Sequence, residues 1–164
     1  MAQFRRIGIL TSGGDAPGMN AAIRAAAREA LANGVEVYGI IEGYQGLIDG
    51  NMKLFTSARD LGNIVNKSGT FLYSARCDEF KSPEGMAKAL KTCKDNQIDG
   101  IIAIGGDGTF RGATDLSAHG VPVAIDIPAT IISVAFSMCI GIIFGMLPAM
   151  KAANLNPIEA LRRE

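Results

Sequence analysis

The chain has 164 residues, of which 48% are hydrophobic and 20% charged, and its 16 lysines and arginines balance its 16 aspartates and glutamates. This length suffices for one domain with a buried core, and we expect no second complete domain. Zero net charge provides no long-range field to attract a polyanion, which excludes a basic nucleic-acid-binding protein. The mean hydropathy of +0.22 and the 20 glycines fit an α/β nucleotide-binding domain or a membrane segment.

Strand-like and helix-like segments alternate through residues 1–126. β-branched and aliphatic runs predict strands, whereas alanine-rich or well-capped runs, such as the one that begins at Ser82 and Pro83, predict helices. This alternation predicts an α/β fold in which helices cover both faces of a parallel sheet. We expect strands over 6–11, 35–41, 101–104 and 121–125, helices over 19–32, 58–66, 83–96 and 110–118, a loop over 42–51 and an extended segment over 69–75.

Two glycine-rich turns, TSGGD at 11–15 and GGDGT at 105–109, follow predicted strands. Ligands of parallel α/β sheets bind beyond the carboxyl ends of the strands, where glycines let backbone amides approach phosphate oxygens. A carboxylate among such amides needs a cation beside it, so we interpret Asp107 as the Mg²⁺ side of a nucleotide site. Thr109 would add a hydroxyl contact or cap the following helix. The alternative is that both turns are only tight connections between strands and helices.

Three runs of sequence resemble a known family. They are LTSGGDAPGMNAAIR at 10–24, GTFLYSAR at 69–76 and IGGDGTFRGA at 104–113. Together they resemble the amino-terminal, ATP-binding half of bacterial ATP-dependent 6-phosphofructokinases. The resemblance covers residues 1–126 and implies a Rossmann-like sheet, Mg-ATP as the phosphoryl donor, fructose 6-phosphate as the acceptor and a homo-oligomeric assembly.

The resemblance also implies roles for individual residues. Asp107 would lie at Mg²⁺. Arg24 and Arg28, one helical turn apart, match positions that bind an allosteric nucleotide at a subunit contact, although a solvated cationic helix face is an equally good interpretation. The residues implied to hold ATP are Gly14, Arg76, Cys77, Gly106, Asp107, Gly108 and Thr109.

The sequence departs from the family pattern after the predicted strand at 121–125. The family has Pro-Gly-Thr-Ile-Asp-Asn-Asp there, and its first aspartate is the base that takes the proton from the sugar hydroxyl. This chain reads PATIISV over 128–134, so Ile132 occupies the position of the base. An alkyl group cannot accept a proton, and the family's sugar-phosphate-binding half is absent from these residues. We therefore predict an incomplete fructose 6-phosphate site and little or no kinase activity.

The segment 127–150 carries no charge, and beyond residue 126 only Lys151, Glu159, Arg162, Arg163 and Glu164 are charged. A helix over it would be about 36 Å long, against about 30 Å for the hydrocarbon core of a bilayer. We expect a transmembrane-type helix here, with a buried core helix as the alternative. Residues 137–164 resemble the last transmembrane helix and tail of ABC transporter permeases of the macrolide-export and lipoprotein-release type. The predicted parts are thus 1–126, 127–150 and a short polar tail at 151–164.

The two ends of the chain predict conflicting topologies. The apolar run at 7–10 is too short for a signal peptide, so residues 1–126 should remain in the cytoplasm, with Cys77, Cys93 and Cys139 as reduced thiols. The basic tail, by the positive-inside rule, would also lie in the cytoplasm, which would place residues 1–126 outside. We therefore favour a truncated or chimeric reading frame joined near 126–133, with a membrane-anchored permease fragment as the alternative.

Overall fold

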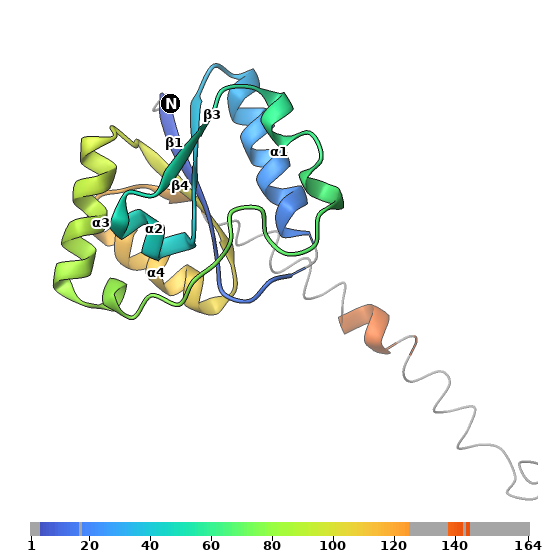
Figure 1. Ribbon diagram of the computed structural model, residues 1–164. Helices are drawn as coiled ribbons and strands as arrows, with labels where there is room; N and C mark the ends of the chain where they lie inside the picture. The colour runs from blue at the N-terminus through green and yellow to red at the C-terminus, as the bar shows by residue number, and fades with distance from the viewer. Residues whose placement is uncertain (1–3, 17, 125–137, 143, 145–164) are drawn as a thin grey trace, which may run out of the picture. The chain divides into compact units, whose positions relative to one another are not determined.

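The computed structural model describes residues 4–16, 18–124, 138–142 and 144 (Figure 1). The chain divides into two units, Met1–Ile125 and Asp126–Glu164, and the sheet and its helices belong to the first. In the second unit, residues 138–142 and 144 are helical. Ile132, the tail at 151–164 and most of the predicted helix over 127–150 lie outside the described residues, so these expectations stay predictions.

A five-stranded sheet forms the centre of the first unit, in the order β3-β2-β1-β4-β5. The central strand β1 (Arg6–Ser12) pairs in parallel with both β2 (Glu36–Ile40) and β4 (Gly100–Gly105). At one edge, β5 (Val123–Ala124) is parallel to β4. At the other edge, β3 (Met52–Phe55) is antiparallel to β2. The α/β class is confirmed, but the prediction of a wholly parallel sheet is wrong at β3.

The short connection between β2 and β3 explains the antiparallel edge. A parallel crossover needs about a dozen residues or more, and residues 41–51 fall just short of that. Instead of a loop, this connection contains the helix α2 (Gly43–Asp49). Its glycines are needed because the backbone packs closely: a Cβ atom on Gly46 would overlap the carbonyl oxygen of Ile41. Glycine content therefore reflects close packing of this helix and not an irregular loop.

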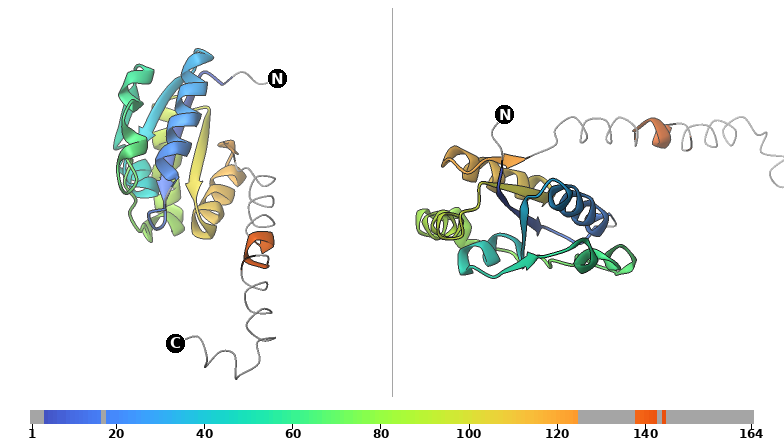
Figure 2. Two further views of the ribbon diagram at one scale, coloured as in Figure 1. Left: turned by 90° about the vertical axis from the view of Figure 1, so that its right-hand side faces the viewer. Right: turned by 90° about the horizontal axis from the view of Figure 1, so that it is seen from above.

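Helices cover both faces of the sheet, as Figures 1 and 2 show. The helix α1 (Met19–Ala32) packs on one face, together with the short 3-10 helices η1 (Ala58–Leu61) and η2 (Ile64–Asn66). The helices α2, α3 (Pro83–Asp95) and α4 (Asp107–Ala118) pack on the other face. The prediction of a single helix over 58–66 is therefore wrong, because this segment forms two separate 3-10 turns.

The side chains of each central strand point alternately into two apolar cores, one on each face of the sheet. In β1, Ile7 and Ile9 enter the core beneath α1, whereas Leu10 enters the core shared by α2, α3 and α4. In β4, Ile101 belongs to the core shared by α2, α3 and α4, whereas Ile102 packs against the core beneath α1. Both faces of each central strand are thus buried, which accounts for the continuous apolar runs in their sequences.

The predicted start of α3 agrees with the structure. The hydroxyl of Ser82 accepts a hydrogen bond from the Gly85 amide at 3.0 Å, and Pro83 is the first residue of α3, which confirms the predicted start of that helix. No helix in the part of the chain that the structure describes is both long enough and apolar enough to cross a bilayer.

Candidate functional site

The two glycine-rich turns lie side by side because β1 and β4 are neighbours. In the register of these parallel strands, Ser12 is opposite Gly105, so both strands end at the same level (Figure 1). The turns open into a cavity with a volume of about 1390 Å³. The prediction that these turns meet at the carboxyl edge of the sheet is confirmed.

Every residue that the sequence assigns to the nucleotide lines this cavity, although the residues come from three separate segments. They are Gly14, Arg76, Cys77, Gly106, Asp107, Gly108 and Thr109. The structure brings them together at one cavity. Arg24 and Arg28 are not among the residues that line the cavity; both belong to α1. The position of Ile132 lies outside the described residues.

Thr109 connects the two turns. Its side chain is 2% exposed, and its hydroxyl donates a hydrogen bond to the Ser12 carbonyl at 3.0 Å. The N-cap of α4 is Gly106, and no side chain caps the helix there. Of the two functions predicted for the Thr109 hydroxyl, helix capping is therefore wrong. Close packing continues at Gly105, where a Cβ atom would overlap the same Ser12 carbonyl.

Asp107 is the first residue of α4 and the one carboxylate among the predicted site residues. Its side chain is 80% exposed, and it pairs with Arg111 one turn later at 2.9 Å. Among the described residues, no group of three or more His, Cys, Asp or Glu side chains could hold a metal ion. Mg²⁺ does not need such a group, since proteins often bind it through one or two carboxylates and the substrate's phosphates.

Cationic side chains also line the cavity. Arg76, Lys81 and Arg111 contribute them from the loop before η3 (Glu79–Lys81), from η3 itself and from α4. The Lys81 ammonium, 2.7 Å from Asp78, lowers the pKa of that carboxyl group, and Arg76 lowers it further. These cations could offset the negative charge of a polyphosphate that enters the cavity.

An aromatic pair forms the apolar part of the cavity. The rings of Tyr44 and Phe80 are stacked with their centroids 4.2 Å apart, and both residues line the cavity. The Tyr44 hydroxyl donates a hydrogen bond to the Thr109 carbonyl at 2.6 Å, and burial raises the pKa of the phenol. Sequence reasoning missed both residues, because no spacing links Tyr44 in α2 to Phe80 in η3.

Cys77 is partly buried at the cavity wall. Burial raises the pKa of its thiol, so the thiol is protonated at neutral pH. It therefore offers a small apolar surface to a ligand and not a thiolate nucleophile.

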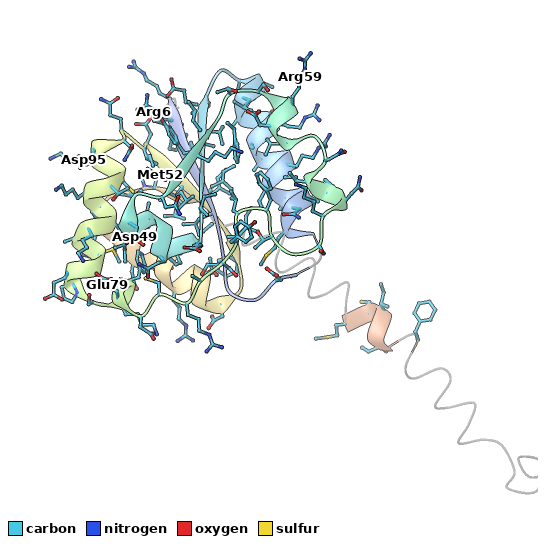
Figure 3. All side chains as sticks on the ribbon, in the orientation of Figure 1. Arg6, Asp49, Met52, Arg59, Glu79 and Asp95 are labelled. Carbon is cyan, nitrogen blue, oxygen red and sulfur yellow. The ribbon has the colours of Figure 1, made fainter. Side chains whose placement is uncertain are left out.

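The amino ends of the strands carry a separate set of polar contacts. There Arg6 forms an ion pair with Glu36 at 2.6 Å and donates a hydrogen bond to the Asn96 carbonyl at 2.8 Å. Figure 3 shows Arg6 and Asp95 on this side of the molecule, where β1 begins. These contacts join β1 to β2 and to the end of α3, and they lie at the opposite end of β1 from the glycine turns.

A family model described as Phosphofructokinase matches residues 6–144. The chain belongs to the phosphofructokinase family. The ATP-dependent 6-phosphofructokinase of Shouchella clausii is 53% identical over 128 residues, which are 78% of this chain and 40% of that protein. The protein of the same name from Bacillus licheniformis is 42% identical over 155 residues, 90% of this chain and 48% of that protein.

Solved phosphofructokinase structures share the fold. The T-state crystal structure of Pichia pastoris phosphofructokinase superimposes with a TM-score of 0.67 and 38% identity, over 72% of this chain and 14% of that one. The chain thus spans less than half the length of the curated phosphofructokinases it matches. The family match extends beyond residue 126, and the comparisons give no support to the predicted permease-like tail.

Proposed function

We propose that residues 1–126 bind Mg-ATP in the cavity between the two glycine turns, as the nucleotide-binding part of a phosphofructokinase. The observation that carries this proposal is the convergence of three distant segments, all of which resemble the family's ATP-binding half, on one cavity. The curated relatives are named ATP-dependent 6-phosphofructokinases, which supports the choice of nucleotide.

Each part of the cavity suits a different part of Mg-ATP. The backbone amides of the two glycine turns and the start of α4 would bind phosphate oxygens. Asp107 would hold Mg²⁺ together with those oxygens, and Arg76 and Arg111 would balance the remaining negative charge. The Tyr44 and Phe80 rings, stacked on each other and nearly buried, would contribute an apolar wall beside the nucleobase.

Calorimetric titration with ATP in the presence and absence of Mg²⁺ tests this proposal. We expect Asp107→Asn to weaken Mg-ATP binding about tenfold but not to weaken Mg²⁺-free binding, because the carboxylate acts through the cation and repels phosphates without it. Asp95→Asn is the matched control, since Asp95 is an exposed carboxylate at the end of α3, away from the cavity (Figure 3). Absence of Mg-ATP binding by the unmodified chain would refute the proposal.

We further propose that this chain has little or no phosphofructokinase activity by itself. The family reaction converts ATP and fructose 6-phosphate to ADP and fructose 1,6-bisphosphate. Ile132 stands where the family pattern has its base, and an alkyl side chain cannot accept a proton. A coupled assay for ADP, with and without fructose 6-phosphate, should show no sugar-dependent turnover. Rapid sugar-dependent ADP formation would show that this part of the proposal is wrong.

The uncharged segment 127–150 favours a second candidate, a chain that contacts a membrane. Under this proposal the chain is a permease fragment or a chimeric reading frame whose first 126 residues remain in the cytoplasm. Fractionation of cells that express the full chain separates the candidates, because a membrane-bound chain sediments with the bilayer. Sequencing across codons 126–133 then tests the chimeric junction, and an uninterrupted native reading frame would reject it.

A further inference from the structure

The segment 67–77 reaches the cavity without forming a helix or a strand. Its last four residues, Ser74, Ala75, Arg76 and Cys77, all line the cavity. No backbone ladder fixes this segment. One backbone hydrogen bond, from the Glu42 amide to the Leu72 carbonyl at 2.8 Å, attaches it to the residue before α2, and contacts with side chains of neighbouring elements hold it further.

One side chain of α1 makes three of these contacts. The amide nitrogen of Asn20 donates hydrogen bonds to the carbonyl oxygens of Lys67 at 3.1 Å and Gly69 at 2.9 Å. The amide oxygen of Asn20 accepts a hydrogen bond from the Phe71 backbone amide at 2.6 Å. Asn20 thus binds three backbone groups in the first half of the segment.

Hydroxyl groups fix the second half. Thr11, near the end of β1, donates a hydrogen bond to the Tyr73 carbonyl at 2.8 Å and accepts one from the Thr70 hydroxyl at 2.9 Å. The Ser74 hydroxyl donates to the Gly13 carbonyl at 2.7 Å, so the segment is also attached to the first glycine turn.

These polar groups occupy positions where apolar side chains are the rule. Thr11 is fully buried, and Asn20 and Thr70 are 5% and 6% exposed. Burying a polar side chain is unfavourable unless it is hydrogen-bonded, and here their hydrogen bonds are made with this segment or with one another. Their polarity therefore serves the placement of residues 67–77 and adds nothing to the apolar cores.

We propose that Asn20 is a positioning residue, assisted by Thr11, which holds the segment 67–77 so that Arg76 reaches the nucleotide. This inference rests on the proposed function, because it assumes that the cavity binds Mg-ATP. Neither Asn20 nor Thr11 lines the cavity, so both would act through the segment.

Asn20→Ala tests the proposal, with Asn33→Ala as the matched control. Asn33 is an exposed asparagine at the other end of α1, where its amide donates to the Glu29 carbonyl at 2.8 Å. We expect Asn20→Ala to raise the Kd for Mg-ATP at least tenfold and Asn33→Ala to change it less than twofold. Equal affinities of the two variants would overturn the proposal.

A double-mutant cycle with Arg76→Ala separates positioning from general stability. If Asn20 acts by placing Arg76, the double variant binds Mg-ATP no more weakly than Arg76→Ala alone. If Asn20 only stabilises the fold, the two losses add, and the proposal is wrong.

A second pair of variants covers the case in which Asn20→Ala does not fold. Thr11→Val removes the hydroxyl at nearly constant volume, whereas Thr11→Ser retains it. We expect Thr11→Val to weaken Mg-ATP binding about fivefold or more and Thr11→Ser to restore most of the affinity. Two variants with the same affinity would count against the proposal.

Hydrogen exchange distinguishes failure of this inference from failure of the proposed function. The Phe71 amide should exchange at least tenfold faster in Asn20→Ala than in Asn33→Ala, with no nucleotide present. If exchange is faster but the unmodified chain does not bind Mg-ATP, Asn20 still holds the segment in place, and only the proposed function is refuted. Unchanged exchange would refute the positioning inference whatever the nucleotide does.

Discussion

Thr109 shows at the scale of one residue how the two glycine turns are held together. Its buried hydroxyl donates to the Ser12 carbonyl, and its own carbonyl accepts a hydrogen bond from Tyr44. We expect Thr109→Val to lower the free energy of unfolding by about 1–3 kcal/mol, because the partly buried Ser12 carbonyl loses this donor. Urea denaturation measures this change. Thr109→Ser, which keeps the hydroxyl, is the control, and equal stability of both variants would contradict this role.

Some residues of the candidate site could be predicted from a local sequence pattern, whereas others join the site only through contacts between distant segments. Gly106, Asp107 and Gly108 could be predicted, because a glycine turn between a strand and a helix has a local signature. Tyr44 and Phe80 could not be predicted in this way, since each ring becomes part of the cavity only when α2 and η3 pack together. No local pattern encodes that contact.

Among the elements, α3 depends on a cap that the sequence already indicates. The Ser82 hydroxyl accepts from the Gly85 amide and donates to the Glu79 carbonyl at 2.7 Å, so it joins α3 to η3. Ser82→Ala should lower the free energy of unfolding by about 1 kcal/mol, as measured by urea denaturation. Ser117→Ala, at an exposed position within α4, is the control and should have no such cost. A neutral Ser82→Ala would show that the cap adds nothing.

Helices and strands were predicted correctly where the hydrophobic pattern of the sequence matches the burial of the residues in the structure. The strands β1, β2 and β4 have apolar runs because both of their faces are buried, and α1 and α3 end at residues typical of helix termini. Prediction failed for α2, whose glycines suggest a loop, and for β3, whose residues Lys53 and Leu54 are exposed on an edge strand. The two failures differ in origin: close packing sets the conformation of α2, whereas β3 lacks the buried apolar pattern of the central strands.

At the scale of the whole molecule, the core that α2, α3 and α4 cover contains or borders three groups that cannot ionise without cost. Burial raises the pKa of the Cys93 thiol to about 11, and it also raises the pKa values of Cys77 and Tyr44. Cys93 belongs to the core beneath α2, α3 and α4, together with Leu10 and Ile101. All three groups are neutral acids in the folded state at neutral pH, so alkaline conditions favour the unfolded chain.

The direction of this pH dependence follows from proton binding. Between pH 9 and pH 11 the Cys93 thiol is ionised in the unfolded chain but protonated in the folded chain, so the folded state binds more protons. The free energy of unfolding therefore falls as the pH rises through this window, by about 2 kcal/mol from Cys93 alone. Urea denaturation at pH 8, 9, 10 and 11 should show this loss. Cys93→Ala should be less stable at pH 8, because it creates a cavity, yet its stability should fall less steeply toward pH 11. Parallel pH profiles of the two proteins would show that Cys93 does not limit alkaline stability.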